Sequence, residues 1–180
     1  MSNMTFLCLV GISDPIREDV ADCIQQLKAS KIRTIMITPD EHHSSVAVAK
    51  KVGLIPADVT EKDEPLYAMS CEKLSKENDI ALGIMLKDNI TCFTNCSIDQ
   101  KRRIVKLLQS LNEVVAATGD SALDADLLIE ADVGFALGSA SHISQDSADI
   151  VLTDDHFGTI LSSIKWGRLI TASIRRFIQF

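Results

Sequence analysis

The segment Val-Val-Ala-Ala-Thr-Gly-Asp-Ser-Ala-Leu-Asp-Ala, residues 114–125, constrains the fold more than any other feature of the chain. It begins as an apolar run and ends in two carboxylates, Asp120 and Asp124. An apolar run that stops at Gly-Asp is typical of a buried strand, and open α/β sheets bind their ligands at the carboxyl ends of such strands. Two carboxylates there suit Mg²⁺, which takes one or two of them together with phosphate oxygens. The alternative is a strand followed by an Asp-capped helix without a ligand.

Strands and helices are expected to alternate along the whole chain. Short apolar runs predict strands at residues 5–12, 33–38, 80–86, 90–94, 114–118, 133–136 and 150–152. Helical spacing of apolar residues predicts helices at residues 16–29, 42–52, 64–76, 98–111, 123–130, 141–147 and 157–180. This alternation predicts an α/β fold with a mainly parallel sheet and helices on both faces, a three-layer αβα domain.

Composition excludes several classes of protein. The net charge of −7 argues against nucleic-acid binding. The longest apolar runs fall well short of the roughly 20 residues that cross a bilayer, and the start resembles no secretory signal, so we expect a cytoplasmic location. Five cysteines at irregular spacing indicate reduced thiols. Cys92 and Cys96 are a weak metal pattern, and packed or surface thiols are expected instead. Adjacent His42 and His43 are expected at a solvated helix start.

Five blocks of the sequence, in order, resemble the motifs of P-type ATPases, which belong to the haloacid dehalogenase-like superfamily. The block at 118–124, T-G-D-S-A-L-D, resembles T-G-D-G-x-N-D. The others are V-G-I-S-D-P-I-R at 10–17 (family G-x-x-D-P-x-R), I-M-I-T-P-D at 35–40 (I-M-x-T-G-D), S-I-D-Q-K at 97–101 (S-P-x-x-K) and S-A-D-I-V-L-T-D-D-H-F at 147–157 (A-D-I-V-L-x-D-D-N-F). The set most resembles the phosphorylation domain of calcium-transporting ATPases of the plasma-membrane type, which implies the haloacid dehalogenase-like, Rossmann-like version of the αβα fold.

The resemblance implies a phosphate-and-magnesium site, because these pumps position a phosphoryl group and neutralise its charge. Asp120 matches the Asp that binds Mg²⁺, and Asp124 matches the second Asp of that motif. Lys101 matches the Lys that neutralises phosphoryl charge, and Thr38 matches the Thr that donates a hydrogen bond to a phosphate oxygen. The structural alternatives are a strand-end cap for Thr38 and a solvated helix charge for Lys101.

The chain also departs from the family pattern. The nucleophile segment D-K-T-G-T does not occur in these 180 residues. Pro39 replaces a Gly and removes a backbone N–H, Leu123 replaces an Asn, and Ser121 replaces a Gly, which is awkward if the turn needs a positive φ. We therefore expect weak Mg²⁺ binding, no ATP binding in isolation and no independent phosphorylation cycle. Asp14 is a substitute nucleophile if residues 5–12 take the place of the missing strand, but the D-P-x-R match explains Asp14 without catalysis.

The resemblance divides the chain into a core at residues 1–156 and a long final helix at 157–180. The final helix resembles the stalk before the fifth membrane helix of the pumps. An apolar stripe and nearby arginines favour a protein partner or the cytosolic surface of a membrane, and the alternative is that the stripe packs on the domain. The stripe contains Ile160, Ile164, Gly167, Ile170, Ile174 and Phe177.

Three functions follow from these observations. The leading hypothesis is a degenerate relative of the P-type ATPase phosphorylation domain, which acts as a non-catalytic binding, regulatory or structural subunit. The first alternative is a cytosolic fragment of a calcium-transporting P-type ATPase, which needs its nucleophile segment and nucleotide-binding domain. The second is a small Mg²⁺-dependent phosphatase that uses Asp14.

Overall fold

The computed structural model describes residues 5–11, 15–87 and 90–180. Within these residues the strands form two three-stranded sheets, and every strand pairing is parallel. The first sheet has the order β1-β3-β2, and the second has the order β4-β5-β6. The strands are β1 (Met36–Ile37), β2 (Ala68–Ser70), β3 (Cys92–Thr94), β4 (Ala116–Gly119), β5 (Val133–Ala136) and β6 (Ile150–Val151). The predicted α/β fold with parallel strands and surrounding helices is confirmed.

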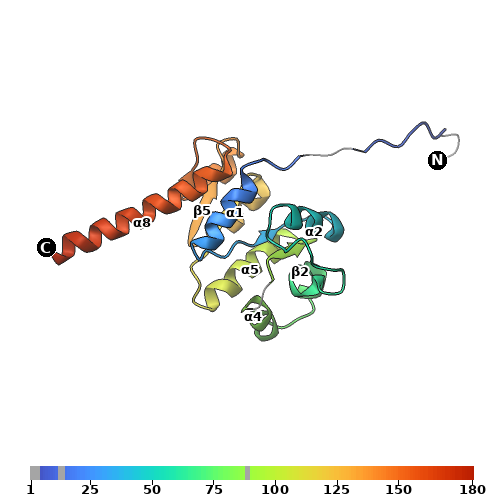
Figure 1. The fold of residues 1–180 in the computed structure, drawn as a ribbon, viewed down its shortest axis with the longest axis horizontal. Coiled ribbons are helices and arrows are strands. Elements are labelled where there is room, and N and C mark those ends of the chain that lie inside the picture. Colours follow the sequence, from blue (N-terminus) through green and yellow to red (C-terminus); the bar gives the residue numbers. More distant parts are fainter. Residues whose placement is uncertain (1–4, 12–14, 88–89) are drawn as a thin grey trace.

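Helices surround both sheets (Figure 1). They are α1 (Val20–Ala29), α2 (His42–Lys51), α3 (Cys71–Leu74), α4 (Asp79–Lys87), α5 (Ile98–Ser110), α6 (Ala125–Glu130), α7 (His142–Ser147) and α8 (Phe157–Gln179), with 3₁₀ turns η1 (Glu64–Leu66) and η2 (Ala122–Asp124). A capping box starts α5: the Ser97 hydroxyl accepts the Gln100 N–H at 3.4 Å, and the Gln100 side chain accepts the Ser97 N–H at 2.8 Å. This box defines the start of the helix that carries Lys101.

Helix α5 joins the two sheets through the hydrophobic core. Ile104 packs in the cluster around Phe93 of β3. Val105, on the next position of the helix, packs with Ala117 of β4 and with α6. Val115, which precedes β4, contacts both clusters. A single amphipathic helix therefore packs on both sheets and places Lys101 at the carboxyl end of β4.

Residues 5–11 form no strand, so this part of the strand predicted at 5–12 is wrong, and Ile12 lies outside the described residues. Their apolar side chains are exposed, for example Phe6 at 77% and Leu9 at 88%. A strand is stabilised by hydrogen bonds to a neighbouring strand. No described strand pairs with this segment, so its apolar run has no sheet to pack on.

Two predictions about the middle of the chain are also wrong. The predicted strand at 80–86 is part of helix α4, in which Leu82 and Leu86 are buried on one face while Ile84 is 63% exposed. A short apolar run does not distinguish a strand from a helix, and this run is rich in Ala, Leu and Met, which favour a helix. The predicted helix at 64–76 divides into η1, β2 and α3, because Pro65 lies in the first turn of η1 and Ser70 caps a new helix.

Helix α8 leaves the body of the molecule (Figure 1). Its first turns pack on the domain through buried Ile160 and Leu161, and Arg168 donates to the Ser30 carbonyl at 3.1 Å. Further along, Ile170 is 53% exposed and Phe177 is 83% exposed. Of the helices in the described residues, none combines the length and apolar character needed to cross a bilayer. The division of the chain at residues 156 and 157 stays a prediction.

Candidate functional site

Lys101 and Asp124 form an ion pair at the carboxyl end of β4. The Lys101 Nζ lies 2.8 Å from the Asp124 Oδ1, and the two side chains are 13% and 10% exposed. The other carboxylate oxygen, Oδ2, accepts the Ser121 hydroxyl at 2.8 Å and the Ser121 N–H at 3.4 Å. Burial alone raises the pKa of Asp124, but the hydrogen bonds from Lys101 and Ser121 and the Lys101 charge outweigh it, so the pKa lies below its ordinary value. Lys101 is therefore a paired, mostly buried cation and not a solvated helix charge.

Gly119 makes room for this ion pair. A Cβ at position 119 would lie 2.6 Å from the Asp124 Cβ and 3.3 Å from its Cγ. Real Cβ atoms essentially never approach another atom as closely as 2.6 Å, so any residue larger than glycine would push Asp124 away from the strand end. The glycine of the Thr-Gly-Asp motif is required here by the close approach of a side chain.

Ser121 adopts an ordinary extended backbone, with φ −100° and ψ 154°. The turn does not need a positive φ, so the condition under which serine would be awkward at this position is not met. Ser121 instead contributes two hydrogen bonds to Asp124 that a glycine could supply only in part. Leu123, in the same turn, is 62% exposed.

Asp120 offers the accessible carboxylate of the site. Its side chain is exposed, and its backbone carbonyl accepts the Ser141 N–H at 2.9 Å. Both oxygens of Asp124 already accept hydrogen bonds, so Asp120 is the carboxylate better placed for a cation. Among the described residues no group of three His, Cys, Asp or Glu side chains could hold a metal. This donor set fits an Mg²⁺ ion that keeps water and phosphate oxygens as its other ligands, and it does not form a protein cage.

Thr38 follows β1 and belongs to a loop with internal hydrogen bonds. Its N–H donates to the Phe93 carbonyl at 3.0 Å, and its hydroxyl donates to the Asp40 Oδ2 at 2.7 Å. Two backbone bonds join this loop to the segment before α5, from the Cys96 N–H to the Thr38 carbonyl and from the Asn95 N–H to the Asp40 carbonyl. The Thr38 loop and the start of the Lys101 helix are thus connected. The remaining site candidate, Asp14, lies outside the described residues.

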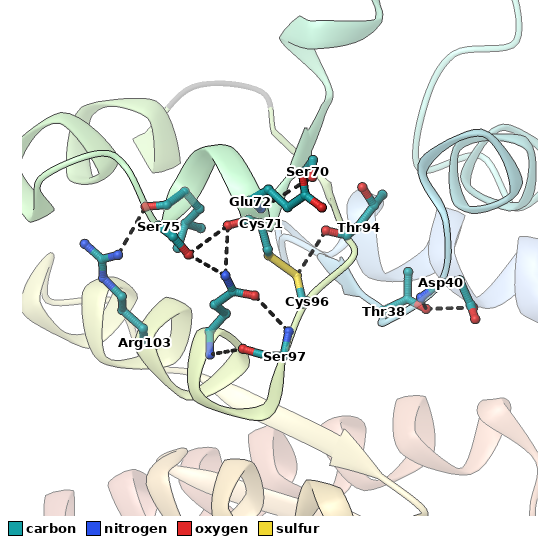
Figure 2. Close-up of a disulfide and its surroundings, with 12 residues drawn as sticks. Thr38, Asp40, Ser70, Cys71, Glu72, Ser75, Thr94, Cys96, Ser97 and Arg103 are labelled. Carbon is teal, nitrogen blue, oxygen red and sulfur yellow. Dashed lines mark hydrogen bonds between the residues drawn. A yellow bond between two sulfur atoms is a disulfide. The ribbon is translucent and has the colours of Figure 1, made fainter.

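Cys71 and Cys96 form a disulfide at the start of α3 and the loop before α5 (Figure 2). The prediction that the cysteines are all reduced is therefore wrong for this pair, whose spacing of 25 residues carried no signal. Gln100 of the capping box donates to the Cys71 carbonyl at 2.9 Å, so α3 and α5 are joined twice. Cys92 is a buried free thiol whose pKa is raised to about 12 by burial and by the Glu64 charge.

His42 lies at the start of α2, as predicted, but its side chain is only partly exposed and makes two contacts with other side chains. Its Nδ1 lies 3.0 Å from the Oγ1 of fully buried Thr94, and its Nε2 lies 2.9 Å from the Glu64 Oε1. His43, by contrast, is exposed. The imidazole thereby ties η1 to the end of β3, beside the Thr38 loop. This contact, and the hydrogen bond from Ser144 to the Ser121 carbonyl, join residues far apart in the chain and leave no local sequence signal. The pattern Ser-x-x-Gln at 97–100, by contrast, is a local signal that indicates the start of α5.

Comparisons with known proteins identify the family and the fold. Residues 5–132 match the family model of the haloacid dehalogenase-like hydrolases. The chain is 35% identical over 178 residues to the endoplasmic reticulum calcium ATPase srcA of Aspergillus fumigatus, and 34% identical over 174 residues to calcium-transporting ATPase 2 of Saccharomyces cerevisiae. These alignments cover 99% and 96% of this chain but only 18% and 14% of the two relatives.

Two solved structures of P-type ATPases are similar in fold. The catalytic domain of the CPx-ATPase CopB-B, from a study of conformational changes upon nucleotide binding, shares 25% identity over 85% of this chain and 47% of its own, with a TM-score of 0.60. A zinc-transporting PIB-type ATPase, at 21% identity, covers 91% of this chain and 21% of its own, with a TM-score of 0.67. The chain resembles the phosphorylation domain of calcium-transporting P-type ATPases, and it belongs to the haloacid dehalogenase-like hydrolase family.

Proposed function

We propose that this chain provides the charge-neutralising part of a P-type ATPase phosphate site and performs no catalysis alone. The observation that carries the proposal is the Lys101–Asp124 pair at the carboxyl end of β4. An ammonium group held in place before the phosphate arrives stabilises developing negative charge without reorganisation at the moment of reaction. A lysine on a solvated helix face would not have this property.

Each residue of the site has a defined part in this function. Lys101 shares its hydrogens between Asp124 and a phosphate oxygen, while the Asp120 carboxylate takes Mg²⁺, which supplies positive charge when bound. Thr38 donates its hydroxyl to a phosphate oxygen after releasing Asp40. Both β1 and β4 are edge strands in the described residues, so each offers an edge with which a further strand can pair.

Three features support a non-catalytic role for the chain by itself. The sequence contains no D-K-T-G-T segment to supply the nucleophile. Pro39 has no N–H to donate beside Thr38, and Leu123 is an exposed apolar side chain where the family motif has Asn. A binding, regulatory or structural subunit explains these departures directly. The alternative, a cytosolic fragment of a calcium-transporting pump, is supported by the small share of each relative that the chain spans.

Binding of Mg²⁺ and inorganic phosphate tests the proposed site. Calorimetry should show weak Mg²⁺ binding that Asp120→Ala removes and Asp126→Ala retains, because Asp126 is an exposed carboxylate on α6. With Mg²⁺ present, Lys101→Ala should weaken phosphate binding, whereas Lys106→Ala, an exposed lysine of the same helix, should not. Mg²⁺ binding that survives Asp120→Ala, or phosphate binding that survives Lys101→Ala, would rule the site out.

Incubation with γ-labelled ATP and Mg²⁺ tests the lack of catalysis. The chain should acquire no hydroxylamine-sensitive label, because acyl-phosphate formation needs a positioned nucleophile. Labelling that is lost in Asp14→Asn would instead establish the small-phosphatase alternative.

We also propose that the exposed part of α8 docks on the cytosolic surface of a membrane. Ile170, Ile174 and Phe177 are exposed there, and Arg168, Arg175 and Arg176 add positive charge to an acidic chain. The chain should bind vesicles that contain anionic lipid, and truncation after Trp166 should remove this binding while the domain stays folded, since Ile160 and Leu161 remain. Absence of vesicle binding would favour a protein partner, and unfolding on truncation would show that the helix belongs to the core.

A further inference from the structure

Ser144 of α7 is a completely buried hydroxyl, with 0% of the residue exposed. Its Oγ donates to the Ser121 carbonyl at 2.6 Å and lies 2.9 Å from the Ser141 Oγ. A serine hydroxyl has a single hydrogen. Because Ser144 gives its hydrogen to Ser121, the Ser141 hydroxyl must donate to Ser144, while the Ser141 Oγ accepts the Ser144 N–H at 3.2 Å. The two serines therefore form a directed chain that ends on Ser121.

The same chain of hydrogen bonds continues to the ion pair. The Ser121 carbonyl accepts both Ser144 and the Asp124 N–H, the latter at 2.9 Å, so both of its lone pairs are used. The Ser121 N–H and hydroxyl point to the Asp124 Oδ2, and the Oδ1 of Asp124 faces Lys101. Ser144 thus touches neither charged group, yet it holds the residue that orients one of them.

We propose that Ser144 is a positioning residue for the candidate phosphate site, and that its buried hydroxyl keeps Ser121 in the conformation that aims Asp124 at Lys101. The role of the Lys101–Asp124 pair in phosphate binding rests on the proposed function. The effect of Ser144 on the position of Lys101 rests only on the hydrogen bonds described above.

If the Ser144 hydroxyl served packing alone, its removal would change stability and leave the position of Lys101 unchanged. Alanine fills nearly the same space as serine, and loss of Ser144 still leaves the Ser121 carbonyl bonded to the Asp124 N–H. The domain should therefore remain folded in Ser144→Ala, while Ser121 is held by one bond fewer. Ser147 is the matched control, because it lies on the same helix and its hydroxyl donates only to the Ile143 carbonyl of the preceding turn, at 2.8 Å.

The test is the exchange of the Lys101 ammonium hydrogens with water, measured by NMR in the full chain with ¹⁵N-labelled lysine. The exposed Lys106 ammonium gives the internal reference. Ser144→Ala should speed the Lys101 exchange about fivefold, the ratio that one ordinary hydrogen bond corresponds to. Ser147→Ala should leave it unchanged, and Ser144→Thr, which keeps a hydroxyl, should restore slow exchange. A thermal melt of each variant measures stability separately.

A Ser144→Ala variant that melts earlier but keeps slow Lys101 exchange would overturn the inference, because the hydroxyl would then serve packing only. If that variant does not fold, Ser144→Cys takes its place, because cysteine is close to serine in size but is a weaker hydrogen-bond donor. Faster Lys101 exchange is again the expected result, and unchanged exchange would contradict the inference. The test needs neither Mg²⁺ nor phosphate. Failure to bind those ligands would therefore count against the proposed function and not against the part assigned to Ser144.

Discussion

The two sheets hold their shares of the candidate site by different means. On the β1-β3-β2 side, the Thr38 loop rests on a core that contains fully buried Phe93 and on a segment anchored by the Cys71–Cys96 disulfide. On the β4-β5-β6 side, the Asp120–Asp124 turn is held by hydrogen bonds from small polar side chains and by the fit of Gly119. Covalent and apolar contacts do not respond to a ligand's charge, whereas hydrogen bonds to carboxylates do. The backbone of the Thr38 loop is therefore held by contacts that a ligand's charge leaves unchanged, whereas the acidic turn is held mainly by hydrogen bonds to the Asp124 carboxylate.

Removal of the Phe93 ring should have the largest effect on stability. Phe93→Ala takes a fully buried aromatic side chain from the centre of β3 and should lower the free energy of unfolding by about 3–5 kcal/mol. Urea denaturation followed by circular dichroism measures the change. Leu128→Ala, in the cluster of the other sheet, is the matched variant, and a loss there that exceeds the loss at Phe93 would reverse the comparison.

Removal of the Cys71–Cys96 disulfide should have the second largest effect on stability. Replacing Cys71 and Cys96 together by alanine should cost about 3 kcal/mol, because the crosslink no longer restricts the unfolded chain. Denaturation under non-reducing conditions measures the loss, and added dithiol should erase the difference from the parent chain. Thiol counting on the denatured, unreduced protein should find the three free cysteines, Cys8, Cys23 and Cys92, and a count of five would show that the bond does not form.

A methyl group at position 119 tests the fit behind the ion pair. Gly119→Ala should destabilise the fold by about 1–3 kcal/mol, because its Cβ overlaps Asp124. Gly167→Ala on α8 is the control, since a Cβ there meets nothing within 4 Å, and it should be neutral or stabilising by about 0.5–1 kcal/mol. Equal effects of the two substitutions would contradict the close approach of Asp124 to β4.

The smallest expected effect concerns Glu130 of α6, which pairs with Arg102 at 2.7 Å and with Lys106 at 3.3 Å across the surface of α5. The hydrogen bond from Arg102, together with Lys106, lowers the pKa of Glu130 from its ordinary 4.5. Because the folded pKa is the lower one, the stabilisation is complete above that ordinary value and disappears as the pH falls through the folded pKa. The urea midpoint of Glu130→Gln should therefore depend less on pH in this acidic range than that of the parent chain, and salt should reduce the difference. If the urea midpoints of the two proteins change with pH in parallel, the ion pairs of Glu130 do not contribute to stability.

Several features of the site could be predicted from residues that are close together in the sequence. The apolar run before Thr118-Gly119-Asp120 predicted β4, and its last residues predicted the place of the acidic turn. The amphipathic pattern of residues 98–111 predicted α5, within one residue of its observed end. Both signals depend on neighbours a few residues apart, and regular secondary structure is encoded at that distance.

Other features depended on residues far apart in the chain, and local patterns carry no information about them. The sequence by itself determined the class of fold, the acidic turn and the family to which the chain is related. Tertiary structure alone decided that Cys71 meets Cys96 and that His42 meets Thr94, 52 residues away. It also decided that Ser144 reaches Ser121, 23 residues away. The physical reason is that a buried polar group takes whichever partner the packed elements bring to it, and the position of that partner is set by the whole fold.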